Sequence, residues 1–318
     1  MDSEATTTLT SRPLADLRRQ ISTIIKGKEA QTEDCLACLL AGGHLLIEDL
    51  PGVGKTTLAH VLSISLGLQF SRVQFTTDLM PSDLLGVSVY NPAAVATGAS
   101  AFQFHRGPVF SQVLLADEIN RAGPKTQSAL LEAMEEYQVS VDGVTHPLPL
   151  PFFVIATQNP SEQLGTHPLP ESQLDRFLMC ISLGYPDRQS ERELLMGQDS
   201  RELLRQLKPV MTPEQLQALQ REVLKIHVAP SLLDYLQALL EATRSGEWFQ
   251  EGLSPRAGLA LLRAARAKAL LSGRDYVSPD DLQAILPQTI AHRLRPRGGS
   301  ARGAREQVRA MMAAVPLP

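Results

Sequence analysis

A glycine-rich loop that directly follows a short apolar run constrains this chain more than any other feature. Residues 49–57 read Asp-Leu-Pro-Gly-Val-Gly-Lys-Thr-Thr, and Leu45, Leu46 and Ile47 stand just before them. Glycines let a backbone curl around a polyphosphate so that successive N–H groups point at its oxygens. A helix that begins at the lysine would aim the positive end of its dipole at the same oxygens. The loop therefore predicts a strand, a phosphate-binding turn and a helix in succession.

The residue types within the loop predict a nucleotide with a magnesium ion. Lys55 supplies a cation for the β- and γ-phosphates, and Thr56 offers a hydroxyl to Mg²⁺. The generic pattern G-x-x-x-x-G-K-[ST] has glycine where this chain has Asp49, so a glycine-rich turn without nucleotide is the alternative. The intact Pro-Gly-x-Gly-Lys-Thr core favours binding. We expect these residues to contact the nucleotide: Asp49, Pro51, Gly52, Val53, Gly54, Lys55, Thr56 and Thr57.

Length and charge limit the class of protein. The 318 residues suffice for two domains at about 100–200 residues each. A net charge of −4 gives no global field that attracts nucleic acid or an anionic membrane. No apolar run reaches the roughly 18–20 residues that a bilayer requires, and the acidic N-terminus lacks a signal-peptide core. We expect a cytoplasmic protein with no membrane insertion.

Cys35 and Cys38 form a C-x-x-C pair, which in other contexts binds metal or acts in redox chemistry. Their neighbours place apolar residues on one helix face, and no second Cys or His pair stands nearby at zinc spacing. We expect both cysteines to pack as small buried apolar residues.

Strand and helix patterns alternate over the first part of the chain. Apolar runs suited to buried parallel strands occur at 45–48, 70–75, 113–116, 151–157 and 177–183. A helical pattern at 125–137 places Leu130, Leu131 and Met134 on one face. This order predicts an α/β fold with a five-stranded parallel sheet between two layers of helices.

Two segments interrupt the alternation. Residues 76–112 look long and irregular and include a run of small residues at 92–100, and such a loop is usually functional or mobile. The dipeptide Asp142-Gly143 lies between alternating apolar residues, which predicts a β-hairpin.

The chain reads almost wholly helical after Pro186, so we expect a domain boundary near residue 187. Thr212, Ser254 and Ser278 each precede a proline and predict helix starts. In the second of these helices, the spacing puts Leu259, Leu262 and Ala265 on one face.

The C-terminal end carries many arginines, which suits a solvated tail or, less often, a segment that binds nucleic acid or acidic partners. These arginines are Arg293, Arg295, Arg297, Arg302, Arg305 and Arg309. We expect a nucleotide-binding domain at 1–187, a helical domain at 188–296 and a flexible basic tail at 297–318.

Two carboxylates end the apolar run at 113–116. Asp117 is suited to hold Mg²⁺ through its water shell, and Glu118 to orient or deprotonate an attacking water. Two acids that merely solvate a strand end are the alternative. Their position after a phosphate loop in a parallel sheet favours the chemical interpretation, because such sheets carry their chemistry at the carboxyl ends of the strands.

Three further residues are candidates for catalysis. Asn159 follows the fourth apolar run and could bond the γ-phosphate or the nucleophilic water, although Asn before Pro is also an ordinary turn former. Arg176 and Arg256 could each stabilise charge in the transition state, since arginine is always charged and bonds bidentately. A surface salt bridge is the alternative for both arginines.

These residues resemble an AAA+ ATPase of the MoxR family over roughly residues 13–296. The stretches that carry the resemblance are 48–56, 117–122, 125–134, 156–160, 174–177, 254–257 and 272–279. In that family Asp at position 49 is common, so the departure from the generic loop does not weaken the match.

The resemblance implies a fold and an assembly. The core would carry a helix-2 insert and a pre-sensor hairpin within about 76–148, followed by an all-helical lid. The nucleotide would be ATP with Mg²⁺, bound between subunits of a homo-oligomeric, usually hexameric ring. Asn159 would be the sensor-1 residue and Arg256 the sensor-2 residue. Arg176 would act as an arginine finger on the neighbouring subunit, with Arg121 and Arg106 as alternatives.

The resemblance also implies a chaperone-like role. Members are thought to work with a separate von Willebrand factor A domain protein on a client, often a metalloenzyme. A nucleic-acid motor and a nucleotide-gated scaffold without turnover are the alternatives from other classes. A small-molecule kinase would not explain the helical domain with Arg256, and the chain lacks the Asn-Lys-x-Asp motif of GTPases.

Overall fold

A five-stranded parallel sheet forms the centre of the molecule. The structure, a computed structural model, describes residues 2–92, 101–159, 166–196, 200–298 and 303–317. The strand order is β2-β5-β8-β1-β9, and every pairing within this sheet is parallel. The strands are β1 (Leu45–Glu48), β2 (Phe70–Gln74), β5 (Val113–Asp117), β8 (Phe153–Gln158) and β9 (Met179–Ile181). The predicted fold class is confirmed.

Helices cover both faces of the sheet, as the continuous apolar strands require. Leu45 and Ile47 of β1 face the core formed with α2 (Glu29–Leu40) and α3 (Lys55–Ser65). Leu46 faces the opposite core, which α6 (Pro124–Glu136) covers. Cys35 and Cys38 are fully buried in the first of these cores, in agreement with their predicted packing.

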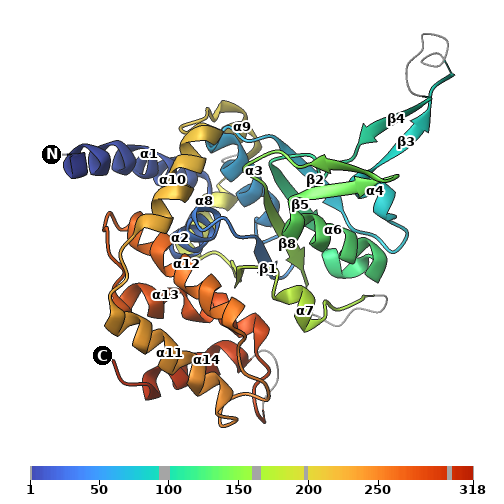
Figure 1. Ribbon diagram of the computed structural model, residues 1–318. Helices are drawn as coiled ribbons and strands as arrows, with labels where there is room; N and C mark the ends of the chain where they lie inside the picture. The colour runs from blue at the N-terminus through green and yellow to red at the C-terminus, as the bar shows by residue number, and fades with distance from the viewer. Residues whose placement is uncertain (1, 93–100, 160–165, 197–199, 299–302, 318) are drawn as a thin grey trace.

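The segment after β2 is more regular than the sequence suggested. It contains α4 (Pro81–Leu85) and an antiparallel pair, β3 (Gly86–Tyr90) with β4 (Phe102–Arg106). The expectation of an irregular segment is therefore wrong for these residues, and the pair projects away from the sheet at the upper right of Figure 1. Of the small-residue run at 92–100, residues 93–100 lie outside the described residues. Strands β3 and β4 are short and most of their residues are exposed, which is why hydrophobic periodicity alone did not predict them.

The second interruption forms the predicted hairpin. β6 (Gln138–Val141) pairs with β7 (Val144–Pro147), and Asp142 and Gly143 both take positive φ angles in the turn, at 51° and 77°. Positive φ at both central residues is the geometry of the tightest hairpin turn, which Asp-Gly favours.

The remaining chain is helical. An N-terminal helix precedes the sheet elements, and short helices and single turns connect strands: α1 (Asp2–Ile24), η1 (Ile119–Arg121) and α7 (Glu171–Leu174). The helices after β9 are α8 (Arg188–Leu195), α9 (Ser200–Gln206), α10 (Pro213–Lys225), α11 (Pro230–Arg244), α12 (Pro255–Leu271), α13 (Pro279–Ile290), η2 (Ala291–Arg293) and α14 (Ala304–Ala314). Thr212, Ser254 and Ser278 cap α10, α12 and α13, as predicted. Among the described residues, no helix has the length and apolar character that crossing a bilayer demands.

The C-terminal segment is not the expected tail. Residues Ala304–Ala314 form α14, which packs against α11 and α13. Ala304, Val308 and Met311 are buried at helical spacing, so an apolar stripe accompanies the arginines. Arg305 donates to the backbone carbonyl of Cys180, 2.9 Å away. The prediction of a flexible tail is wrong here because charge counting overlooked the stripe, and Arg302 lies outside the described residues.

The predicted face of α12 needs a correction at one position. Leu262 and Ala265 pack into the core, but Leu259 is 66% exposed. The buried face instead runs through Ala257, Leu261 and Ala264.

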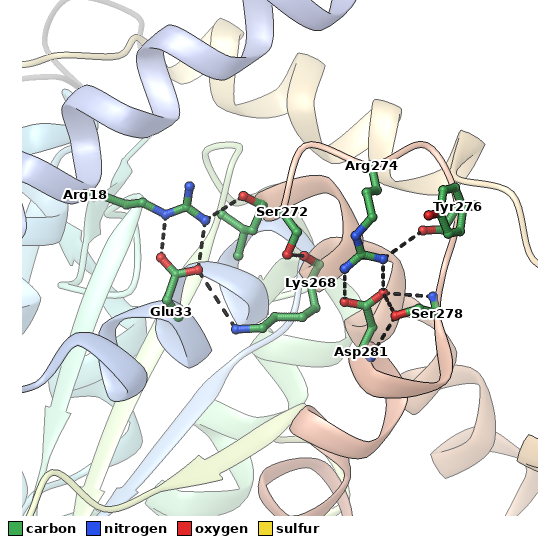
Figure 2. Close-up of polar contacts among 9 residues, drawn as sticks. Arg18, Glu33, Lys268, Ser272, Arg274, Tyr276, Ser278 and Asp281 are labelled. Atoms are coloured by element: carbon green, nitrogen blue, oxygen red, sulfur yellow. Dashed lines mark hydrogen bonds and ion pairs between the residues drawn. The ribbon is translucent and has the colours of Figure 1, made fainter. Parts of the chain in front are cut away.

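Two polar clusters stabilise the packing around α12 and the start of α13 (Figure 2). Arg18 of α1 donates to Glu33 of α2 at 2.8 Å and to the carbonyl of Leu271 at 2.6 Å, and Lys268 of α12 stands 4.0 Å from Glu33. The N-terminal helices are thereby joined to α12. In the other cluster, the carboxylate of Asp281 accepts two 2.6 Å hydrogen bonds from Arg274.

Asp281 also completes the cap of α13. Ser278 accepts from the Asp281 N–H, and Asp281 accepts from the Ser278 N–H at 2.9 Å. Burial of this carboxyl group opposes its ionisation, but the hydrogen bonds from Arg274 and Ser278 outweigh that effect and lower the Asp281 pKa. Its stabilising contribution is present above the unfolded-state pKa and is lost as the pH falls through the lower folded-state pKa.

We predict that Asp281→Ala lowers the free energy of unfolding by about 2–3 kcal/mol at pH 7, because it leaves Arg274 without its partner and removes half of the cap. The difference from the parent should shrink below about pH 4, where a carboxyl group of this kind is protonated in the unfolded chain. Urea unfolding across pH measures both effects. The exposed neighbour Asp280→Ala is the control and should cost less than about 1 kcal/mol. Equal losses in the two variants would contradict this account.

Candidate active site

The phosphate loop joins β1 to α3 in the predicted form. Gly52 and Gly54 take φ angles of 84° and 91°, which side chains rarely adopt. α3 begins at Lys55, and no side chain caps it in the described structure. The first N–H groups of this helix therefore remain available to an anion at the loop.

Lys55 is held at the centre of the loop. Its side chain is buried, and Nζ donates to the Asp49 carbonyl at 2.9 Å and lies 3.5 Å from Oδ1 of Asn159. Burial lowers the Lys55 pKa, and the carboxylates of Asp117, Asp49 and Glu118 oppose that shift by favouring the cation. The predicted phosphate-binding lysine and Asn159 thus meet at one place.

Asp49 anchors the loop. Its carboxylate accepts hydrogen bonds from the N–H of Gly184 at 2.7 Å, from the Ser182 hydroxyl at 3.2 Å and from the N–H of Leu50 at 3.0 Å. The loop is thereby tied to the segment after β9. The predicted contact between Asp49 and nucleotide stays a prediction, because these bonds use the side chain within the protein.

Thr157 of β8 links the Asp117 carboxylate to the backbone of Glu118 at the end of β5. Its buried hydroxyl donates to Oδ1 of Asp117 at 2.6 Å and accepts from the Glu118 N–H at 2.9 Å. Glu118 takes a left-handed conformation, with φ 57° and ψ 48°, which is uncommon for a residue with a side chain. The sequence analysis missed the role of Thr157, although a polar residue in an apolar strand was a usable signal.

Both carboxylates pair with arginines. Arg72 of β2 contacts Oδ2 of Asp117 at 2.7 Å, and Arg121 contacts Glu118 at 3.0 Å. Arg72 was not predicted as a site residue, because only the β2–β5 pairing brings it to Asp117.

The residues present fit a magnesium ion. Mg²⁺ in nucleotide sites typically takes one or two protein oxygens and completes its octahedron with phosphate and water. Asp117 and Thr56 would supply those oxygens, and each Asp117 carboxylate oxygen keeps a second lone pair beside its present partner. No cluster of three or more His, Cys, Asp or Glu side chains suited to a metal occurs within the described residues.

A second cluster gathers around Glu135 at the end of α6. Its Oε2 is 2.9 Å from Arg176 and its Oε1 is 2.9 Å from Arg256. Asp175 adds contacts to Arg256 at 3.8 Å and to Arg293 at 3.4 Å. Among the described residues, no hydrogen bond or ion pair joins this cluster to Lys55, Asp117 or Glu118.

The second cluster lines a cavity of about 260 Å³. Four arginines and two acids contribute: Arg176, Arg256, Arg263, Arg293, Glu135 and Asp175. Burial lowers the Arg293 pKa, while the charge of Asp175 opposes that shift. The exposed Leu259 also lines this cavity.

The alternative finger residues lie elsewhere. Arg121 contacts Glu118 within its own subunit, and Arg106 of β4 stacks over the ring of Phe110 at 5.3 Å. Of the three candidates, Arg176 is the one that shares a carboxylate with Arg256.

Comparisons with known proteins identify the family. Residues 44–179 match the family described as "ATPase family associated with various cellular activities (AAA)", and residues 241–313 match the AAA lid domain. The lid match includes α14. The crystal structure of a candidate ATPase from Cytophaga hutchinsonii superposes with a TM-score of 0.86 at 35% identity, covering 96% of each chain.

Two curated relatives cover most of the chain. The Bacillus subtilis protein YeaC, which is uncharacterised, is 48% identical over 86% of this chain and 84% of its own. The chaperone MoxR1 of Mycobacterium tuberculosis is 43% identical over 86% of this chain and 74% of its own. With the AAA and lid matches, these similarities show that the chain belongs to the MoxR family of AAA+ ATPases.

Proposed function

We propose that this protein hydrolyses ATP with Mg²⁺ and uses the energy to remodel or activate a protein client. The observation that supports the proposal is the buried Thr157 hydroxyl, which donates to the Asp117 carboxylate and accepts from the backbone N–H of Glu118. Both carboxylates interact electrostatically with Lys55 of the phosphate loop. A merely solvated pair of strand-end acids would not need the Thr157 hydroxyl. The residues at 51–57 would bind the phosphates, and Asp117 with Thr56 would hold the metal.

Each remaining group has a proposed task. Bound Mg²⁺ would neutralise charge on the β- and γ-phosphate oxygens. Glu118 would orient the attacking water and accept its proton, and Asn159 would fix the position of that water or of the γ-phosphate. The pairing of Glu118 with Arg121 would have to open before the carboxylate could accept a proton.

We further propose that the site is completed by a neighbouring subunit in a ring, most simply a hexamer. Arg176, the proposed finger, and Arg256, the proposed sensor-2 residue, share Glu135. Within the described ranges, no hydrogen bond or ion pair joins them to Lys55 or Asp117, which supports the proposal that both act in trans on the nucleotide of a neighbour. Positive charge from a neighbour would stabilise the transition state only after assembly.

The cellular role is proposed from similarity. A relative 43% identical is named a chaperone. We propose a chaperone-like activity in the cytoplasm, a separate von Willebrand factor A domain partner, and a client such as a metalloenzyme. The domain division near residue 187 also remains a proposal.

One observation favours a second candidate, a nucleotide-gated scaffold without significant turnover. Both site carboxylates are paired with arginines, so turnover would require at least the pair of Glu118 with Arg121 to open. A nucleic-acid motor is disfavoured, since the net charge is −4 and the basic C-terminal segment is largely packed as α14.

We predict that Glu118→Gln keeps ATP binding but lowers turnover by about 10²–10⁴-fold, because the amide cannot accept a proton. Nucleotide titration and steady-state hydrolysis measure the two properties. The exposed Glu132→Gln on α6 is the matched control and should behave as the parent. Parental turnover in Glu118→Gln would exclude Glu118 as the base, and absence of turnover in the parent would favour the scaffold.

We also predict that turnover per subunit rises with protein concentration, because a shared site forms only on assembly. Arg176→Ala should bind ATP normally and lose about 10³-fold in turnover, the effect expected of an arginine finger. Arg106→Ala and Arg121→Ala, measured beside it, test the alternative fingers. Turnover that is independent of concentration and of Arg176 would indicate a complete site within one chain.

A further inference from the structure

Glu135 contacts both arginines that we propose to act on a neighbour's nucleotide. We propose that Glu135 is a positioning residue, which sets the spacing of Arg176 and Arg256 so that both reach one phosphoryl group. This inference rests on the proposed function, since it concerns the half of the shared site that one subunit offers to the next. No sequence pattern pointed to Glu135, because it lies on the polar side of α6.

The geometry of the contact supports this role. Each carboxylate oxygen of Glu135 takes one arginine, and both distances are 2.9 Å. Two oxygens on one carbon and two oxygens on one phosphorus have similar separations, and guanidinium groups bind either in the same planar manner. A pair of arginines aligned on the carboxylate is therefore already spaced for a phosphate.

The three residues come from separate parts of the chain. Glu135 lies at the end of α6, Arg176 precedes β9, and Arg256 lies in the first turn of α12. Without a common partner, each long side chain would sample many rotamers and would lose that freedom on meeting a nucleotide. Holding both before the nucleotide arrives is preorganisation, which lowers the cost of stabilising the transition state.

The charge and exposure of Arg176 and Arg256 leave both able to bind a phosphoryl group while they contact Glu135. The cavity contains four arginines against two acids, so positive charge remains after the internal pairings. Each guanidinium has five N–H donors, and Glu135 uses only some of them. The Arg176 and Arg256 side chains are 28% and 57% exposed, which leaves both open to a neighbouring subunit.

The test compares Glu135→Gln, Glu135→Asp and Glu135→Ala with the parent at a protein concentration where turnover is maximal. We expect kcat to fall about tenfold to a hundredfold, the cost of a misplacement of about 1 Å, with little change in KM or in oligomer size. The kcat of Glu135→Asp, whose side chain is too short to contact both arginines, should lie between those of the parent and Glu135→Ala.

The adjacent Glu136→Gln is the control and should match the parent in kcat. Thermal unfolding of each variant establishes that it is folded, and the near-isosteric Glu135→Gln suffices if Glu135→Ala is not.

A double-mutant cycle separates positioning from a structural role. If Glu135 acts through Arg176 and Arg256, adding Glu135→Gln to Arg176→Ala should lower turnover by a smaller factor than it does in the parent, because only Arg256 is left to misplace. Additive losses would overturn the inference, as would unchanged kcat in Glu135→Gln. A higher kcat in Glu135→Gln would instead show that Glu135 competes with phosphate for the two arginines, and would also overturn the inference.

If the parent shows no Arg176-dependent turnover, the proposed function falls and the inference falls with it. If the parent does show it, failure of the Glu135 variants counts against the inference alone.

Discussion

The parallel pairing of β1, β5 and β8 is the constraint on which the rest of the structure depends. Parallel strands place their carboxyl ends at one edge of the sheet, so the phosphate loop after β1, the acids after β5 and Asn159 after β8 converge there. The contacts of Lys55 with Asn159 and of Thr157 with Asp117 are direct consequences of that register. Asp49 then ties the loop to the segment after β9, the fifth strand. The fold thus assembles the candidate phosphate site from residues far apart in the sequence.

A second cluster of charge lies apart from this site. Glu135 and Asp175 hold arginines from the segment before β9, from α12 and from η2. Its net positive charge and partial exposure suit an anion brought by another molecule, whereas the phosphate loop suits an anion bound within the chain. We interpret the two clusters as complementary halves of one site, which meet when subunits assemble.

Local patterns in the sequence predicted much of this arrangement. The loop at 49–57, the apolar strands, the Asp-Gly hairpin and three capped helices depend on neighbouring residues, so the sequence displays them. Thr157, Arg72 and Glu135 depend on pairings between distant segments, which periodicity does not encode. The prediction for the C-terminal segment counted its arginines and did not consider the apolar stripe of α14. The prediction for α12 placed Leu259 on the buried face because its spacing is helical, but this side chain is exposed.

Mixing two inactive variants tests the shared site most directly. Lys55→Ala should fail to bind nucleotide but keep Arg176, while Arg176→Ala should bind nucleotide but lack the finger. In an equal mixture, about a quarter of subunit interfaces would join an intact phosphate loop to an intact Arg176, so we predict that turnover returns to about a quarter of the parental value. A mixture no more active than the mean of its two components would contradict the account and indicate that each chain carries a complete site.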